Sequence, residues 1–368
     1  MTYFSMVTIR FYQETDQGQW DSYVQNHPRG TFFHLAGWKK VIEKTFHHKS
    51  FYLIAQENNN SKNSINSINP GNPTNSVNPI VGILPLFSVK SILFGKSLVS
   101  LPFAAYGGIL ADNETISNLL LEKAKEMTKA QGLDYLELRN RNEKIEDLPA
   151  KDLYFQFRRE IFEDLDSNME AIPRKSRRMV RQGEKAGLTF EFGSENLVSI
   201  FYDIFAKSYH RLGSPVFPRG LFKNLLSEFK EKASILVAKT QEGSPIASVF
   251  TFFYRDEILP YYAGSLFEYR ELAPNDYMYW QLMKYGCENG YRCFDFGRSK
   301  VDTGSYDFKR HWGFEPEPLE YQYYLSGRDE IPNLSPANPK YRKKIEIWQK
   351  LPFWATKVLG PRIVKYIP

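Results

Sequence analysis

The sequence predicts an α/β (α+β) protein in which two similar units follow one another along the chain. The chain of 368 residues is long enough to form two hydrophobic cores. The same order of strands and one helix recurs in both halves. Each repeat also ends in a similar segment, Gly132–Arg139 (GLDYLELR) in the first half and Gly290–Arg298 (GYRCFDFGR) in the second. We therefore expect two tandem domains, each with a mixed, mainly antiparallel sheet flanked by helices.

Short apolar runs bounded by Gly, Pro and Asn predict the strands, and apolar residues at helical spacing predict the helices. In the first half we expect strands at 51–55, 80–87, 105–110 and 133–138, with a helix at 116–130 before the last strand. In the second half we expect strands at 234–238, 245–253, 260–265 and 292–296, with a helix at 276–288. The expected divisions are an N-terminal domain over 1–155, a C-terminal domain over 156–330, and an amphipathic basic and aromatic tail over 331–368.

Residues 57–79 interrupt the first unit and have a different composition. They are rich in Asn, Ser, Pro and Gly and have few side chains to bury. We expect this low-complexity insert to extend a hairpin loop as a disordered segment.

The bulk composition is that of a soluble globular protein, with 42% hydrophobic and 24% charged residues and a net charge of +6. Such a charge favours anionic partners such as phosphates, RNA or acidic lipid headgroups, or it is only a basic surface. We do not expect DNA as a partner. No membrane-span-length apolar stretch or signal peptide is evident, so we expect a cytoplasmic protein, alternatively one peripheral to the inner face of the cytoplasmic membrane.

Several familiar chemistries lack their sequence patterns. Six histidines form no HxH, HExxH or HxxxH pattern, and two cysteines, Cys287 and Cys293, cannot build a metal site or a disulfide framework alone. We therefore expect no metal. GxSxG, GxxxxGK[ST] and GxGxxG patterns are also absent, which argues against serine hydrolysis, nucleotide hydrolysis and dinucleotide redox chemistry.

The segment 291–314 carries the most chemical information. An apolar strand ends at Gly297, and the residues that follow place Arg298, Lys300, Lys309 and Arg310 among Tyr306, Phe308 and Trp312. Cations interleaved with rings suit an anionic or phosphorylated substrate. The alternative is a solvated basic loop.

Residues 172–188 form a second basic segment, predicted to be a helix that starts at Pro173 and ends at Gly187. Its cations include Arg174, Lys175, Arg177 and Arg178. Like charges at helical spacing repel, which favours a phosphate-binding role over a merely solvated face.

Together these segments resemble the FemABX family of the GNAT-like superfamily. The resemblance is carried by the basic run 173–187, by Ala273–Trp280 (APNDYMYW), by Phe294–Arg298 (FDFGR), by Phe308-Lys309 and by the ending 348–364. It covers nearly the whole chain apart from the insert. More narrowly, the chain is similar to the FemAB-type proteins that accompany exosortase/PEP-CTERM and exopolysaccharide gene clusters.

The resemblance implies two GNAT-like domains and transfer of an aminoacyl or acyl group to an amine on a cell-envelope or exopolysaccharide precursor. It implies no tightly bound cofactor. The donor is expected to be aminoacyl-tRNA, alternatively acyl-CoA. The expected partners are a phosphorylated or lipid-linked saccharide or peptide precursor and tRNA. The C-terminal tail mixes cations with Trp, Ile and Leu, so it is expected to pack on its own domain or, alternatively, to contact an anionic membrane peripherally.

The resemblance also assigns residues. Phe308-Lys309 matches a pair that assists the tRNA end and the transition state, and Lys40 and Arg211 fall where the family contacts phosphates. We expect Lys309, Phe308 and Asp295 to be catalytic, with Asp307 and Glu315 as further candidates for a general base; Asp295 lies in a strand and is alternatively structural. The expected substrate-binding residues are Lys40, Trp38, Arg174, Lys175, Arg177, Arg178, Arg211, Tyr262, Asn275, Tyr277, Arg298 and Tyr306.

Two other functions stay open. GNAT enzymes hold the CoA pyrophosphate on a Gly-rich turn at a helix N-terminus, whereas this chain has Asn275 and Asp276 there, which suit a helix cap. An acyl-CoA- or acyl-carrier-dependent N-acyltransferase acting on a sugar amine is nevertheless the first alternative. A non-catalytic binding module for RNA or lipid-linked saccharide phosphates is the second. The family's coiled-coil arm is not evident, and residues on the substrate side differ.

Overall fold

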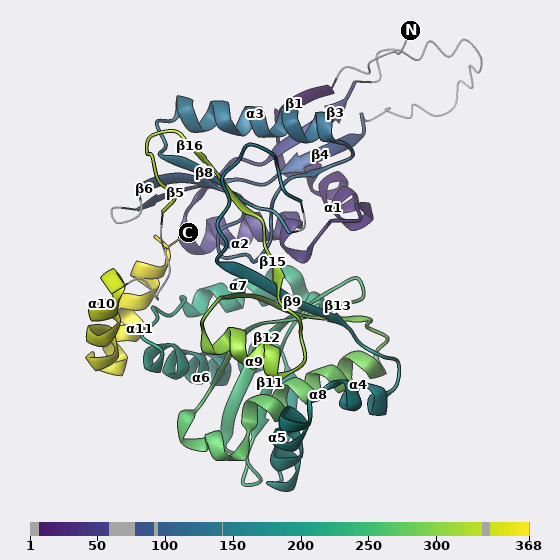
Figure 1. The fold of residues 1–368 in the computed structure, drawn as a ribbon, viewed down its shortest axis with the longest axis vertical. Helices are drawn as coiled ribbons and strands as arrows, with labels where there is room; N and C mark the ends of the chain where they lie inside the picture. Colours follow the sequence, from purple (N-terminus) through teal and green to yellow (C-terminus); the bar gives the residue numbers. More distant parts are fainter. Residues whose placement is uncertain (1–6, 59–77, 92–94, 142, 333–338, 368) are drawn as a thin grey trace, which may run out of the picture.

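The computed structural model describes residues 7–58, 78–91, 95–141, 143–332 and 339–367. Two α/β bodies follow each other along the chain, the first in the upper half of Figure 1 and the second in the lower half. Mixed, mostly antiparallel sheets flanked by helices confirm the expected fold class.

The first body holds two sheets, with strand orders β1-β3-β4-β7 and β16-β8-β6-β5-β2. The chain changes sheet at Pro85, between β4 and β5, where proline cannot donate a ladder hydrogen bond. The elements are β1 (Val7–Phe11), α1 (Gln17–Asn26), α2 (Ala36–Phe46), β2 (Lys49–Ser50), β3 (Leu53–Glu57), β4 (Ile80–Leu84), β5 (Phe87–Ser91), β6 (Gly95–Val99), β7 (Leu110–Ala111), α3 (Glu114–Ala130) and β8 (Tyr135–Arg139).

The second body is built on one sheet of seven strands, in the order β10-β11-β12-β13-β14-β9-β15. Successive residues of β11 alternate between its faces: Ile235 packs with α6 and α7, and Leu236 packs with α5 and α8. The elements from here to the end of the chain are β9 (Tyr154–Glu160), α4 (Leu165–Ala171), α5 (Arg174–Lys185), β10 (Thr189–Gly193), α6 (Val198–Arg211), α7 (Arg219–Phe229), β11 (Ala233–Lys239), β12 (Pro245–Tyr254), β13 (Glu257–Ser265), α8 (Pro274–Glu288), β14 (Cys293–Lys300), α9 (Gly304–His311), β15 (Glu317–Pro318), β16 (Tyr321–Leu325), α10 (Pro339–Lys350) and α11 (Phe353–Val364). Of these, β16 belongs to the first body.

The two bodies share strands and a core. β9 pairs with β14 in the second body, and the chain later returns so that β16 pairs antiparallel with β8 in the first. The rings of Phe32 and Phe252 stack across the junction with centroids 4.2 Å apart. β16 falls inside the range 156–330 expected for the second domain, but it belongs to a sheet of the first body. The divisions at 155 and 330 stay predictions.

The first body differs from the sequence prediction before β3, where β1, α1 and α2 were not predicted, and again between β4 and β8. A β5–β6 hairpin precedes β8, and the strand expected over 105–110 is present only as the short β7. β3 and β4 pair antiparallel around the insert, whose residues 59–77 lie outside the described residues. In the second body, β11, β12, β13, α8 and β14 occupy the places that the apolar pattern predicts.

The tail folds into α10 and α11, which lie beside α6 at the edge of the molecule in Figure 1. Gln349 of α10 donates a hydrogen bond to the carbonyl of Arg211, and His210 bonds the carbonyl of Leu351. The tail therefore packs on its own protein. None of the helices in the described ranges combines the length and the apolar content that a membrane crossing requires.

Candidate active site

Lys309 lies in α9 with its ammonium group buried against β14. Its Nζ donates to the carbonyls of Phe296 at 2.7 Å, Gly297 at 3.2 Å and Arg298 at 3.1 Å, and it lies 5.3 Å from the centre of the Phe157 ring. Only 8% of the residue is exposed. Burial lowers the pKa of Lys309 to about 7, although the nearby Asp295 carboxylate opposes this shift. The side chain is thus poised between its charged and neutral forms near neutral pH.

A β-bulge explains why three consecutive carbonyls can reach one ammonium group. In a regular strand, successive carbonyls point in opposite directions. In β14, however, Phe296 and Gly297 both oppose Phe157 of β9, since the register shifts between Asp295 and Arg298. Gly297 adopts a φ of 64°, which a residue with a Cβ rarely adopts. The Phe-Gly-Arg sequence therefore creates a carbonyl cradle for Lys309.

Phe308 belongs to a ring cluster on the other side of α9. It is half-buried, and its centroid lies 5.6 Å from that of Tyr279 and 6.0 Å from that of Trp312. Tyr306, which was expected to bind substrate, contacts Phe155 and Phe157 edge-on. The catalytic pair expected from the sequence thus joins a buried cation to a partly open aromatic surface.

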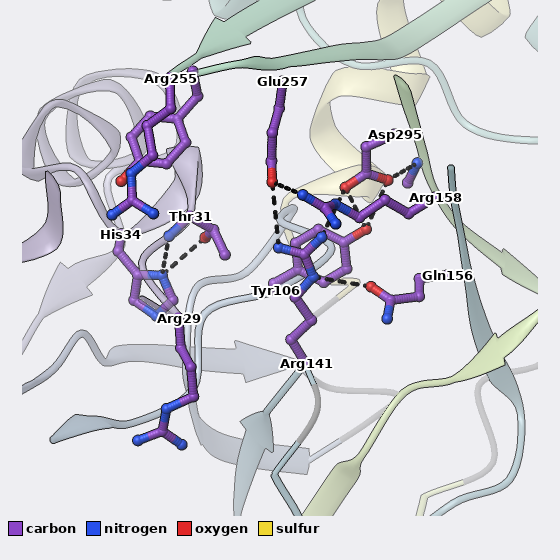
Figure 2. Close-up of polar contacts among 12 residues, drawn as sticks. Arg29, Thr31, His34, Tyr106, Arg141, Gln156, Arg158, Arg255, Glu257 and Asp295 are labelled. Carbon is purple, nitrogen blue, oxygen red and sulfur yellow. Dashed lines mark hydrogen bonds and ion pairs between the residues drawn. The ribbon is translucent and has the colours of Figure 1, made fainter. Parts of the chain in front are cut away.

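Asp295 lies at the junction of the two bodies, just before the bulge. Both of its oxygens accept the Tyr106 hydroxyl, at 2.9 and 3.0 Å, and Oδ1 also accepts the backbone N–H of Gly297 at 2.7 Å (Figure 2). Only 1% of Asp295 is exposed. Burial and the Asp295 charge raise the pKa of Tyr106 well above its ordinary value, so the phenol stays protonated and donates. Asp295 is therefore placed to hold the bulge rather than to meet a substrate.

A charge network continues from Asp295 along the junction (Figure 2). Arg141 lies 3.6 Å from the Asp295 carboxylate and 3.9 Å from that of Glu257, and Arg158 forms a further ion pair with Glu257. Burial raises the pKa of Glu257, and Arg141 opposes this shift. The network joins β9, β13 and β14 to the loop after β8.

A cavity of about 260 Å³ opens beside this network. Its lining combines both bodies, with Arg29, His34, Tyr106 and Arg141 from the first and Arg255 among those from the second. Arg29 is paired with Glu143, and Arg255 donates to the carbonyls of Val24, Gln25 and His27. The arginines of this cavity thus have acidic or carbonyl partners, and the lining is close to electrically balanced.

His34 in this cavity is neutral. Burial lowers its pKa to about 3. Its Nε2 lies 3.1 Å from the Gly108 carbonyl, which can only accept, and its Nδ1 lies 2.8 Å from the Thr31 hydroxyl. The proton is therefore on Nε2, and the ring acts as a fixed polar bridge inside the first body.

Arg298 extends from β14 beyond the Lys309 cradle. Its guanidinium donates to the Tyr321 hydroxyl at 2.8 Å and lies 4.8 Å from the centre of the Tyr154 ring. Lys300 lies 5.5 Å from the same ring, and burial together with the Arg298 charge lowers its pKa to about 7. Two cations of β14 thus follow Asp295, and both lie near the Tyr154 ring.

The basic helix α5 presents an open cationic face. Ser176, Val180 and Gly183 form its buried side, and the cations lie on the remaining surface. They border a shallow depression and comprise Arg174, Lys175, Arg177, Arg178, Arg181 and Lys185. The Ser176 hydroxyl donates to the carbonyl of His311 at 2.7 Å, so the start of α5 adjoins the end of α9. The basic face therefore lies in the same part of the second body as Phe308 and Lys309.

The start of α8 is closed by side chains. Asp276 accepts a hydrogen bond from Trp312 Nε1 at 2.9 Å, and burial raises its pKa to about 6. Asn275 lies half-buried in the same turn. Tyr277 is buried, and its Cβ lies 2.7 Å from where a Cβ on Gly183 of α5 would be. Tyr277 thus packs α8 against α5, which departs from the expected substrate contact.

Four expected substrate-binding residues lie outside this arrangement. Lys40 donates to Gln17 at 2.7 Å and lies 3.8 Å from Glu228, while Arg211 stacks over Phe267 at the end of α6. Trp38 is fully buried, so it offers a ligand no surface, contrary to the expected contact. Tyr262 is also buried, and its hydroxyl has no hydrogen-bond partner among the described residues.

The structure adds residues that the sequence did not single out, chiefly Tyr106, Arg141 and Glu257. They come from three separate segments and meet only because the first body packs on β13 and β14. Tyr106 follows an apolar run and reads as a strand residue. The sequence gave one signal near this segment: Arg139 ends its repeat segment as Arg298 does in the second repeat, and Arg141 follows two positions later.

Comparison with known proteins agrees with this fold. Residues 172–310 match the family described as an acetyltransferase (GNAT) domain. The chain is 27% identical to the lipid II:glycine glycyltransferase of Staphylococcus haemolyticus over 133 residues, which cover 34% of this chain and 32% of that protein. The protein of the same name from Staphylococcus epidermidis is 28% identical over 134 residues, with the same coverage. The match spans about a third of the length of these relatives.

Two solved structures share the fold over most of the chain. FemX superposes with a TM-score of 0.63 at 15% identity, covering 91% of this chain and 99% of that one. A tandem GNAT protein from the clavulanic acid biosynthesis pathway superposes with a TM-score of 0.51 at 11% identity, covering 88% and 100%. The matched domain, the related sequences and the tandem fold together support a GNAT-like protein that is similar to the FemABX family.

Proposed function

We propose that the protein is an acyltransferase that moves an aminoacyl or acyl group onto an amine of a cell-envelope or exopolysaccharide precursor. The supporting relatives are named as lipid II:glycine glycyltransferases. The observation that carries the proposal is the buried Lys309 ammonium group, held on three carbonyls beside Phe308 within the GNAT domain.

The proposed step is attack of the acceptor amine nitrogen on the carbonyl carbon of an ester donor. The C–N bond forms as the carbonyl becomes a tetrahedral oxyanion, and the C–O bond to the donor hydroxyl then breaks. The proton lost by the amine passes to the departing oxygen. Lys309 stabilises the oxyanion, because a fixed cation in a dry site acts strongly on charge that develops there. An acyl oxygen takes the place of one of the two longer contacts, to Gly297 or Arg298.

Aminoacyl-tRNA is the donor that best suits the second body. Phe308 offers a partly open ring on which a terminal base stacks. The cationic face of α5 adjoins α9 through the contact of Ser176 with His311, and it neutralises the phosphates of the acceptor stem. Donor and catalytic cation then lie on neighbouring elements.

The proposed acceptor is a phosphorylated or lipid-linked saccharide or peptide precursor, in line with the similarity to exopolysaccharide-associated FemAB-type proteins. Arg298 and Lys300 are the cations closest along the chain to the Lys309 cradle, and we assign phosphate contacts to them. Lys40 and Arg211 keep this role as the family resemblance implies. Such an acceptor places the protein in the cytoplasm, beside the inner face of the cytoplasmic membrane.

An acyl-CoA-dependent N-acyltransferase is the second candidate, and the match to the acetyltransferase domain favours it. The turn before α8 argues against it. A diphosphate at this helix start would meet the Asp276 carboxylate, which already accepts the Trp312 N–H, in a segment without glycine.

The test is a transfer assay with purified protein, charged tRNA or acyl-CoA as donor, and amine-bearing precursors as acceptors, followed by mass spectrometry of the acceptor. We expect transfer from charged tRNA and loss of at least about a hundredfold in rate for Lys309→Met, the scale of losing one oxyanion donor. Lys284→Met, which removes a lysine of α8, serves as the matched control and should keep the rate.

Three results would count against this function. Transfer from acyl-CoA alone would favour the second candidate. Binding of tRNA or saccharide phosphates without transfer from any donor would identify a binding module. An unchanged rate in Lys309→Met would remove the catalytic role of this residue.

A further inference from the structure

Helix α11 has one packed face and one open face. Thr356, Gly360 and Val364 face the protein, and a Cβ on Gly360 would lie 2.8 Å from the Val216 backbone nitrogen. The opposite face carries large hydrophobic side chains that are 38% to 71% exposed, namely Trp354, Val358, Leu359 and Ile363.

This exposure is concentrated and follows the helix. Twelve large hydrophobic residues are exposed in the described part of the chain, and six of them are Ile347, Trp354, Val358, Leu359, Ile363 and Tyr366. The four in α11 are spaced i, i+4, i+5 and i+9, which places them on one side of a helix. Scattered exposed hydrophobic residues need no explanation, whereas a contiguous stripe indicates a partner.

The stripe lies in strongly cationic surroundings. Residues 339–367 contain eight lysines and arginines against one glutamate, a net charge of +7, while the whole chain carries +6. The rest of the chain is therefore close to neutral. The glutamate, Glu346, is already paired with Arg342 at 3.2 Å. The net positive charge of the protein thus comes from this tail.

We propose that α10 and α11 form a docking surface for an anionic lipid bilayer. α11 lies in the plane of the interface, with Trp354, Val358 and Ile363 among the acyl chains and headgroups. The cations meet the acidic headgroups. An amphipathic helix with a large apolar face, a tryptophan and flanking cations binds membranes in this way.

The charge and the apolar stripe together select this occupant over others. A second copy of the chain would bring two segments of charge +7 against each other, and like charges at a contact repel. A nucleic acid would match the cations but would leave the apolar stripe in water. A bilayer with acidic lipids accommodates both.

Side-chain contacts hold this docking surface against the second body. Lys357 of α11 pairs with Asp203 of α6 at 2.8 Å, and Gln349 holds the last turn of α6 at Arg211. Tyr209 lies in that same turn. Burial raises its pKa, and the nearby Arg298 guanidinium opposes this shift. If the proposed acceptor is lipid-linked, α6 connects the membrane surface to the cations of β14. This last step rests on the proposed function, and the docking itself does not.

The experiment is flotation of the full-length protein with vesicles of phosphatidylcholine alone or mixed with phosphatidylglycerol, at increasing salt. We expect binding to the acidic vesicles that weakens with salt. The triple variant Trp354→Asn, Val358→Ser, Ile363→Ser should bind at least about tenfold more weakly. The matched control Phe11→Ser, Leu119→Ser, Phe162→Ser removes three exposed hydrophobic side chains elsewhere and should bind like the wild type.

Circular dichroism and thermal unfolding of both triple variants verify that they fold. The proposal is overturned if the Trp354 variant floats as well as the wild type, or if the wild type binds both vesicle types equally at all salt concentrations. Light scattering that shows a dimer in the wild type and a monomer in the Trp354 variant would also overturn it, because the stripe would then join two copies. Transfer to a water-soluble acceptor should be the same in both variants, so failure of docking and failure of the proposed activity can be told apart.

Discussion

The Tyr106 hydroxyl lies 2.9 and 3.0 Å from the two carboxylate oxygens of Asp295, which are separated from it by 189 positions in the sequence. Tyr106 belongs to the first body and Asp295 to β14 of the second. The same carboxylate accepts the N–H of Gly297, so one side chain fixes both the junction and the bulge that cradles Lys309. This arrangement makes Asp295 a positioning residue, the structural reading of the two that the sequence left open.

The first prediction concerns this bond. Tyr106→Phe leaves a buried carboxylate with one partner fewer, and we expect it to lower the free energy of unfolding by about 1–2 kcal/mol. Tyr262→Phe is the matched control, because the Tyr262 hydroxyl is buried without a hydrogen-bond partner among the described residues. Its removal should leave stability unchanged or raise it slightly. Urea unfolding measures both, and equal losses in the two variants would contradict the role of the bond.

The second prediction concerns the charge network. Arg141→Ala leaves the carboxylates of Asp295 and Glu257 close together without their shared cation, and we expect a loss of about 3 kcal/mol in unfolding free energy. Arg292→Ala breaks the ion pair with Glu163, in which both side chains are more than half exposed. That change should cost less than about 0.5 kcal/mol. A small effect of Arg141→Ala would mean that the junction tolerates the uncompensated charge.

The third prediction follows from the raised pKa of Asp276, about 6, against about 3.9 for an unfolded aspartate. Between these values the folded protein binds more protons than the unfolded chain, so its stability falls as the pH rises. In Asp276→Asn this contribution is missing, while the amide oxygen can still accept the Trp312 N–H. We expect the stability of the variant relative to the wild type to rise by about 2 kcal/mol from pH 4 to pH 6 and to stay level above. If the stabilities of the wild type and the variant changed with pH in parallel, the pKa of Asp276 would not be raised.

Local pattern predicted the second body better than the first. β11, β12, β13 and β14 are apolar runs bounded by turn residues, and α8 and α5 carry their own start and stop signals. The β5–β6 hairpin was missed because the run 105–110 is more apolar than β6, which begins Gly-Lys-Ser. The pairing of β16 with β8 was not predicted, because strand pairing between distant segments has no local signature.

The candidate site divides in the same way. Phe308, Lys309 and Arg298 lie in one contiguous segment, and the sequence places them together. The cradle depends on the register of β9 against β14, which turns a Phe-Gly pair into a bulge. The partners of Asp295 depend on the packing of one body against the other. Trp38 was misassigned because a tryptophan inside an amphipathic helix reads the same whether it faces a ligand or the core.

The fourth prediction tests the basic face of α5. Replacing Arg174, Arg178 and Arg181 with Gln should weaken RNA binding and lower the slope of log affinity against log salt by about 1 for each phosphate that the variant no longer neutralises. The control variant has Gln in place of three exposed lysines on other surfaces, Lys90, Lys96 and Lys223. Its net charge therefore equals that of the α5 variant. Equal slopes in the two variants would show that only overall charge matters and that α5 is a solvated face.

The fifth prediction uses the lowered pKa values of Lys309 and Lys300, both about 7. If the Lys309 ammonium stabilises the oxyanion, the transfer rate at saturating substrate should fall as the pH rises through about 7, because the cation is lost in that range. Lys300→Gln should keep this fall, and Lys309→Arg should lose it, since arginine stays charged. A rate that rises through pH 7 would instead make the neutral amine of Lys309 a general base. Because the two lysines titrate together, the wild-type profile alone does not identify the group responsible, whereas the pair of variants assigns it to one side chain.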